Sequence, residues 1–139
     1  MRPVLVDTGV IVALLDRAER YHAAAVTVLE GIDAPLVTCE AVIAESCYLL
    51  RRTSGAPEAV VENVAQGVFQ IPISLSRAAD SVVRLLRKYR DVNIDFADAC
   101  LIQCASVIES GDILTLDSDF RVYRWGKNRE FRMLIPLDV

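Results

Sequence analysis

Short apolar runs alternate along the chain with longer segments in which apolar residues recur at helical spacing. The short runs predict buried strands at residues 4–6, 35–38, 71–73, 113–116 and 133–135. The longer segments predict helices at about residues 10–16, 21–30, 40–52, 57–66, 77–89 and 96–110. Pro72 favours an edge position for its strand, because proline cannot donate a ladder hydrogen bond. Strands that alternate with helices predict an α/β fold with a parallel sheet covered on both faces.

Two aspartates follow predicted strands directly. Asp7 comes after the first strand, and Asp117 comes after the strand at 113–116. In open parallel sheets, ligands bind beyond the carboxyl ends of the strands, so both side chains are expected at one edge of the sheet. Local explanations also exist, because aspartate is a preferred helix N-cap and the segment 117–119 can be a plain turn.

Two further acids interrupt apolar helical segments. The helical neighbours of Glu45, three and four residues away, are all apolar or aromatic: Ala41, Val42, Tyr48 and Leu49. Asp98 lies in a helix that its composition predicts to be buried almost all round. The simpler alternatives are a surface glutamate at the edge of an apolar stripe, and an aspartate that adds charge to the first helical turn behind an Asp95 N-cap.

Buried carboxylates point to a shared acidic pocket. An ionised carboxylate is costly to remove from water unless it is paired or binds a metal. Clustered carboxylates repel one another, and cations relieve this repulsion. Oxygen ligands alone suit hard cations such as Mg²⁺ or Mn²⁺, which can activate water and stabilise charge on a phosphate. The four acids therefore predict phosphodiester hydrolysis.

The composition predicts one domain over residues 1–139. The chain is 53% hydrophobic with a mean hydropathy of +0.35, which favours some surface covered by another chain. No apolar run approaches the roughly 18 residues of a membrane helix, and Asp7 interrupts the N-terminal apolar stretch, so we expect a cytoplasmic protein without a membrane partner. The four cysteines lie in apolar helical segments and are expected to be small buried hydrophobic residues.

Other chemistries lack the residues they need. His22 is the single histidine, which excludes two-histidine cleavage of RNA within one subunit, and we expect it to be structural or exposed. The six glycines form neither a GxxxxGK nor a GxGxxG phosphate-binding loop.

The net charge is −4, but the basic residues are unevenly distributed. Residues 121–132 contain five of them, Arg121, Arg124, Lys127, Arg129 and Arg132. This stretch can be a phosphate-contact surface with Trp125 or Tyr123 as a base-stacking platform, or a solvated loop whose aromatic residues pack on the core. A second basic run, at residues 84–90, is typical of a helix end and can also neutralise a nucleic acid.

Four segments, in this order and spacing, carry a resemblance to a known family: residues 4–8 (VLVDT), 44–46 (AES), 95–99 (DFADA) and 114–120 (LTLDSDF). In these segments, which span nearly the whole chain, the sequence resembles the PIN-domain nucleases. It most closely resembles the VapC-type toxins of bacterial and archaeal toxin–antitoxin pairs.

The resemblance implies a three-layer α/β/α PIN-like fold with a central, mainly parallel sheet of four to five strands. It also implies a Mg²⁺- or Mn²⁺-dependent endoribonuclease that acts on RNA, forms a homodimer and often binds a VapB-like antitoxin. The implied catalytic and metal-binding quartet is Asp7, Glu45, Asp98 and Asp117, with Asp119 as an auxiliary or water-mediated ligand. The expected substrate contacts are Thr8, Arg121, Arg124 and Trp125.

Two alternatives to a toxin remain open from the sequence. One is a PIN-domain nuclease that processes RNA without an antitoxin. The other is a non-catalytic acidic binding module, such as a receiver-like phosphoacceptor domain. A receiver needs a lysine after a later strand, whereas Lys127 lies within the basic stretch.

Overall fold

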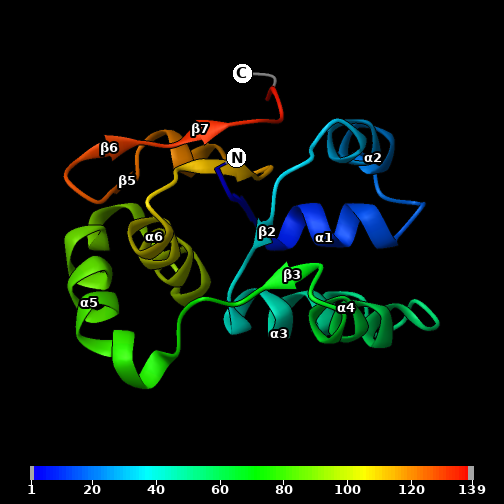
Figure 1. The fold of residues 1–139 in the computed structure, drawn as a ribbon, viewed down its shortest axis with the longest axis horizontal. Helices are drawn as coiled ribbons and strands as arrows, with labels where there is room; N and C mark the ends of the chain where they lie inside the picture. The colour runs from blue at the N-terminus through cyan, green and yellow to red at the C-terminus, as the bar shows by residue number, and fades with distance from the viewer. Residues whose placement is uncertain (1, 138–139) are drawn as a thin grey trace.

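The computed structural model describes residues 2–137, and a five-stranded parallel sheet forms its centre (Figure 1). The strands of this sheet are β1 (Val4–Val6), β2 (Leu36–Val37), β3 (Phe69–Gln70), β4 (Asp112–Leu114) and β7 (Arg132–Met133). They lie in the order β3-β2-β1-β4-β7, and every neighbouring pair is parallel. The predicted α/β fold with a parallel sheet of four to five strands is therefore confirmed.

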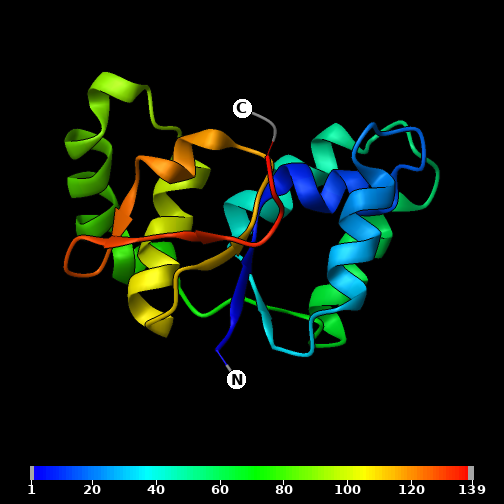
Figure 2. The same ribbon diagram turned by 90° about the horizontal axis from the view of Figure 1, so that it is seen from above.

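Helices connect the strands and cover both faces of the sheet. The α-helices are α1 (Thr8–Leu15), α2 (His22–Glu30), α3 (Glu40–Leu49), α4 (Ala56–Ala65), α5 (Leu75–Lys88) and α6 (Phe96–Ile108). Two short 3₁₀ helices are η1 (Arg90–Val92) and η2 (Ser118–Arg121). Figure 2 shows α5 and α6 on one side of the sheet and α1 and α2 on the other, which gives three layers. Within residues 2–137, no helix is both long and apolar enough to cross a membrane.

Acidic caps determine where two of these helices begin. The side chain of Asp7 accepts a hydrogen bond from Thr8 N at 2.7 Å, at the start of α1. The side chain of Asp95 accepts one from Asp98 N at 2.8 Å, at the start of α6. Each cap satisfies a backbone N–H that has no partner within the helix. Both helices also start at the same end of the sheet, beside acidic side chains.

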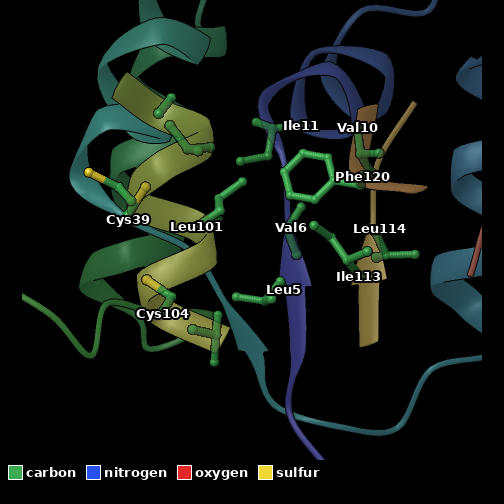
Figure 3. Close-up of a cluster of buried hydrophobic side chains, with 14 of the residues drawn as sticks. Leu5, Val6, Val10, Ile11, Cys39, Leu101, Cys104, Ile113, Leu114 and Phe120 are labelled. Atoms are coloured by element: carbon green, nitrogen blue, oxygen red, sulfur yellow. The ribbon is translucent and has the colours of Figure 1, made fainter. Parts of the chain in front are cut away.

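The core lies between the sheet and the helices that pack on it (Figure 3). Side chains from β1, β4, α1, α6 and η2 meet there and are almost fully buried: Leu5, Val6, Val10, Ile11, Leu101, Cys104, Ile113, Leu114 and Phe120. Cys39 and Cys100 are buried as well, Cys47 is half-buried, and all four cysteines are free thiols. The prediction that the cysteines behave as buried hydrophobic residues holds for the three buried ones.

Four of the five predicted strands have different boundaries in the structure, and β2 is one residue shorter at each end than predicted. The edge strand was expected at 71–73, but β3 occupies Phe69–Gln70, because buried Phe69 packs on the core and Pro72 has no N–H to donate. β4 ends at Leu114, two residues before the predicted end. β7 begins one residue before the predicted strand and ends at Met133.

A short antiparallel hairpin was not predicted from the sequence. Its strands are β5 (Arg124–Trp125) and β6 (Arg129–Glu130), within the basic stretch. Gly126 and Asn128 in its turn have positive φ angles of 55° and 61°, a conformation that these residue types tolerate. Trp125 lies against Gly111, where any Cβ would collide with the indole, so the hairpin packs tightly beside β4.

Candidate functional site

A pocket of about 290 Å³ lies beyond the carboxyl ends of β1 and β4, next to the first turns of α1 and α6. Its lining is formed by Asp7, Thr8, Gly9, Glu45, Leu49, Asp95, Asp98, Leu116 and Asp117. The structure thus brings the four predicted acids, which are up to 110 residues apart in the chain, to one hollow. Asp119 is exposed and does not line this pocket, although its charge acts on Asp117.

Asp7 is 7% exposed and is held at both carboxylate oxygens. Oδ1 accepts the N-cap hydrogen bond from Thr8 N, and Oδ2 accepts a hydrogen bond from Thr115 Oγ1 at 2.7 Å. Burial raises its pKa to about 6, even though these two hydrogen bonds act in the opposite direction. Asp7 therefore caps a helix and lines the pocket at the same time, so the two readings of the sequence are compatible.

Thr115 connects the two aspartates that follow strands. Besides donating to Asp7, its hydroxyl oxygen accepts a hydrogen bond from Asp117 N at 3.0 Å, and the residue is fully buried. Asp117 is half-buried, and its Oδ1 accepts a hydrogen bond from Asp119 N at 2.9 Å. Burial raises the pKa of Asp117, and the charge of Asp119 adds to this rise.

Asp98 lies in the first turn of α6 and is 7% exposed. Its Oδ2 accepts a hydrogen bond from the hydroxyl of Tyr123 at 3.2 Å. Tyr123 is fully buried, and its ring makes edge-to-face contacts with Tyr89 and Phe120 at centroid distances of 5.1 and 5.0 Å. Burial, together with the negative charges of neighbouring acids, raises the pKa of Asp98 to about 8.

Glu45 reaches the same pocket from α3 but is exposed. Of the two interpretations left open by the sequence, the structure supports a surface glutamate at the edge of an apolar stripe, since Val42 is fully buried. Tyr48 and Leu49 of that stripe are 62% and 54% exposed. The charge of Glu45 contributes to the raised pKa of Asp7, so the two carboxylates interact electrostatically across the pocket.

The pocket contains strong negative charge and no basic side chain among its lining residues. Within residues 2–137, no three histidine, cysteine or acidic side chains are arranged closely enough to hold an ion as they stand. The donor chemistry nevertheless fits a hard cation, because the available ligands are carboxylate oxygens in a partly desolvated site. The buried hydroxyl of Thr8, which has no hydrogen-bond partner among residues 2–137, also fits a polar ligand at this place.

The model of the family described as "PIN domain" matches residues 4–126. The chain belongs to the PIN domain family. A relative named "Ribonuclease VapC26", from Mycobacterium tuberculosis, is 31% identical over 116 residues, which cover 82% of this chain and 86% of the relative. The crystal structure of VapC20 from the same organism, titled a sarcin-ricin loop cleaving toxin, matches with a TM-score of 0.78 at 19% identity. That match covers 86% of this chain and 93% of VapC20, and it confirms the predicted fold.

In this PIN domain, two of the predicted substrate contacts have structural partners. Arg124 donates to the carbonyl oxygens of residues 121–123, and it forms an ion pair with Glu130 at 3.5 Å. Trp125 is 8% exposed, and its indole N–H donates to Glu130 O at 3.1 Å. This placement does not fit a base-stacking platform, because the ring packs on the protein. Thr8 lines the pocket and Arg121 is exposed.

The sequence did not reveal how three other residues of the PIN domain contribute to the site. Asp95 was interpreted only as an N-cap, but it also lines the pocket. Thr115 precedes Asp117 by two residues, and this spacing places both side chains on one face of an extended chain, a signal that was available. Tyr123 had no such local signal, because its contact with Asp98 joins residues 25 positions apart.

Proposed function

We propose that this chain is a Mg²⁺- or Mn²⁺-dependent endoribonuclease and the toxin of a VapBC-type pair. The PIN domain and the 31% identity to a protein named as a VapC ribonuclease support RNA as the substrate. The observation that carries the proposal is the meeting of Asp7, Glu45, Asp98 and Asp117 in one pocket whose lining has no cation. Such a pocket is unfavourable in the absence of a positively charged ligand.

The four acids are proposed to hold the metal ion, with Asp119 in an auxiliary or water-mediated role. A bound Mg²⁺ or Mn²⁺ would supply charge stabilisation for the reacting phosphate. Thr115 orients Asp7 through its hydroxyl and fixes the backbone of Asp117, while Tyr123 orients Asp98. Thr8 and Arg121 are the predicted substrate contacts whose positions remain compatible with that role.

The proposal includes partners and a cellular context. It treats residues 1–139 as one PIN domain in a cytoplasmic homodimer that binds a VapB-like antitoxin. Apolar side chains that are exposed on α3, Tyr48 and Leu49, support a covering chain on that face.

Growth and cleavage assays test the proposed function. Expression of the wild-type chain should arrest bacterial growth, and Asp98→Asn should relieve the arrest. The purified protein should cleave structured RNA in the presence of Mn²⁺, and this cleavage should stop when EDTA is added. Glu109→Gln is a matched control, because Glu109 lies at the far end of α6, outside the pocket. Cleavage by Asp98→Asn at the wild-type rate would refute the assignment of the site.

The antitoxin part of the proposal has its own test. A small reading frame next to this gene, when co-expressed, should restore growth and co-purify with the chain. If no neighbouring product does so while cleavage persists, the chain is an RNA-processing nuclease without an antitoxin.

A further inference from the structure

Three exposed cations lie together at the end of α5 and in η1: Arg87, Lys88 and Arg90, here called the basic turn. Within residues 2–137, none of the three forms an ion pair, since the ion pairs there involve Arg2, Arg124 and Arg132. Twelve of the fifteen Lys and Arg residues form no ion pair within residues 2–137, so the three of the basic turn are set apart by their grouping within four positions.

A column of buried tyrosines links the basic turn to the acidic pocket. Tyr89, between Lys88 and Arg90, is buried, and its ring centroid lies 5.1 Å from that of Tyr123. Tyr123 in turn contacts Asp98 through its hydroxyl. The hydroxyl of Tyr89 also accepts a hydrogen bond from Arg124 N at 2.8 Å, so the segment that follows η2 is held beside Tyr89 as well. Two tyrosine rings therefore separate the basic turn from a pocket carboxylate.

The chain path gives an upper limit to the distance between the basic turn and the acidic pocket. Arg90 is five positions before Asp95, which lines the pocket. Even a fully extended chain of that length spans at most about 17 Å. A strand of nucleic acid carries a phosphate roughly every 3.4 Å of helix axis, so a few nucleotides bridge this distance.

The basic stretch at 121–132 is less available than its composition indicated. Arg124 is used by backbone carbonyls and Glu130, and Arg132 pairs with Asp112 at 3.2 Å. The guanidinium of Arg129 lies over the Trp125 ring, at 5.1 Å. In the basic turn, Lys88 lies over the Tyr89 ring at 5.2 Å, whereas Arg87 and Arg90 form no ion pair or cation–π contact within residues 2–137.

We propose that the basic turn binds the phosphate backbone of RNA and leads the strand into the acidic pocket. This inference rests on the proposed function for the identity of the ligand. An acidic pocket repels a polyanion, so affinity must come from cations outside it. Arg87, Lys88 and Arg90 flank Tyr89, which Tyr123 connects to Asp98, and the short chain path from Arg90 to Asp95 limits their distance from the pocket.

RNA binding tests the proposal without requiring catalysis. The basic-turn variant carries Arg87→Glu, Lys88→Glu and Arg90→Glu. A matched control carries Arg17→Glu, Arg20→Glu and Arg77→Glu, which change the charge equally at exposed positions elsewhere. Binding of a fluorescent single-stranded RNA is measured by anisotropy in EDTA at several salt concentrations. The basic-turn variant should bind at least tenfold more weakly, and its log–log salt slope should fall by about 2, which corresponds to three lost contacts. The control should keep the wild-type slope.

Cleavage of two substrates separates this proposal from the proposed function. The basic-turn variant should cut a long RNA poorly but a short oligonucleotide, which reaches only the pocket, at the wild-type rate. If the wild-type chain cleaves no RNA, the proposed function fails, whereas the anisotropy result still decides the role of the basic turn.

Equal RNA binding by the basic-turn variant and wild type would overturn the inference. If the variant instead loses binding to a poly-glutamate peptide, the surface serves an acidic protein segment, and the RNA proposal is wrong. Circular dichroism checks folding. A neutral variant, with Arg87→Gln, Lys88→Gln and Arg90→Gln, repeats the comparison should the reversed charges disturb α5.

Discussion

Asp7 and Asp112 are both buried aspartates, one directly after β1 and one at the start of the adjacent strand β4, so they lie at opposite ends of the sheet and have different partners. Asp112 begins β4, and Arg2 and Arg132 pair with its carboxylate at 3.5 and 3.2 Å. Asp7 follows β1, where its carboxylate receives a backbone N–H and the hydroxyl of Thr115 but no cation. Its other neighbours include further carboxylates, which repel it.

The difference separates a structural acid from one that is available to a ligand. The fold supplies cations to Asp112, so its charge is compensated within the chain. At the pocket, no lining cation compensates the acids, and the pKa values of Asp7 and Asp98 rise instead. A buried acid in this protein is therefore a functional candidate only where the fold places no cationic side chain beside it.

The largest expected effect is on cleavage. Asp7→Asn and Asp98→Asn should each lower kcat/KM for RNA by more than about 100-fold, the upper limit for a residue that only supports a ligand. Asp112→Asn should leave kcat/KM within about twofold, because Asp112 is at the other end of the sheet. The measurement is initial-rate cleavage at saturating Mn²⁺. If Asp112→Asn is as inactive as Asp98→Asn, the comparison between the two ends fails.

A smaller effect is expected from the residue that orients Asp98. Tyr123→Phe removes one hydroxyl donor and should weaken Mn²⁺ binding about tenfold, because the carboxylate is less well fixed. Isothermal titration calorimetry measures the affinity directly. Tyr89→Phe is the matched control, since its hydroxyl contacts Arg124 N and no acid. Equal losses of affinity in both variants would show that packing of the aromatic cluster, and not the hydrogen bond, is responsible.

The buried acids at the two ends of the sheet should also affect the free energy of unfolding in opposite directions. The pKa values of Asp7 and Asp98, about 6 and about 8, lie above the unfolded value of 3.8. The metal-free folded state therefore holds protons that the unfolded chain releases near pH 4. The contribution of Asp7 and Asp98 to the free energy of unfolding should be fully present below that pH and should be lost as the pH rises to about 8. Urea unfolding in EDTA across this range checks the direction.

Substitutions sharpen the stability comparison. At pH 8, Asp98→Asn should raise the free energy of unfolding of the metal-free protein, by on the order of 1 kcal/mol, and it should change little at pH 4. Asp112→Asn should lower the free energy of unfolding by about 1 kcal/mol, because Arg2 and Arg132 lose their partner. Destabilisation of the metal-free protein by both variants at pH 8 would contradict the distinction.

The smallest expected effect concerns Thr8. Thr8→Val removes a buried hydroxyl that has no hydrogen-bond partner in the described part of the chain, so the free energy of unfolding should rise by up to about 1 kcal/mol. Cleavage should fall severalfold if this hydroxyl contacts the substrate. Thermal unfolding and kcat/KM, measured on the same preparation, check both parts. A loss of stability would mean that the hydroxyl has a partner within the fold.

Local pattern predicted most of the elements. Apolar runs located β1 and β4, and helical spacing located α3, α5 and α6 within a few residues. The hairpin of β5 and β6 was missed, because its strands have two residues each and become a hairpin by packing on β4. The sequence left the exposure of Glu45 undecided, since an apolar helical face does not reveal whether it faces the core or solvent.

The sequence by itself determined the alternation of strands and helices, the caps at Asp7 and Asp95, and which residues carry acidic chemistry. These depend on side chains within a few positions of one another, where periodicity and capping act. Only the tertiary structure decided that four acids share a pocket, that Thr115 and Tyr123 orient two of them, and that arginines pair with Asp112 instead. The physical reason is that compensation of a buried charge depends on distance in space, which the order of residues in the chain does not specify.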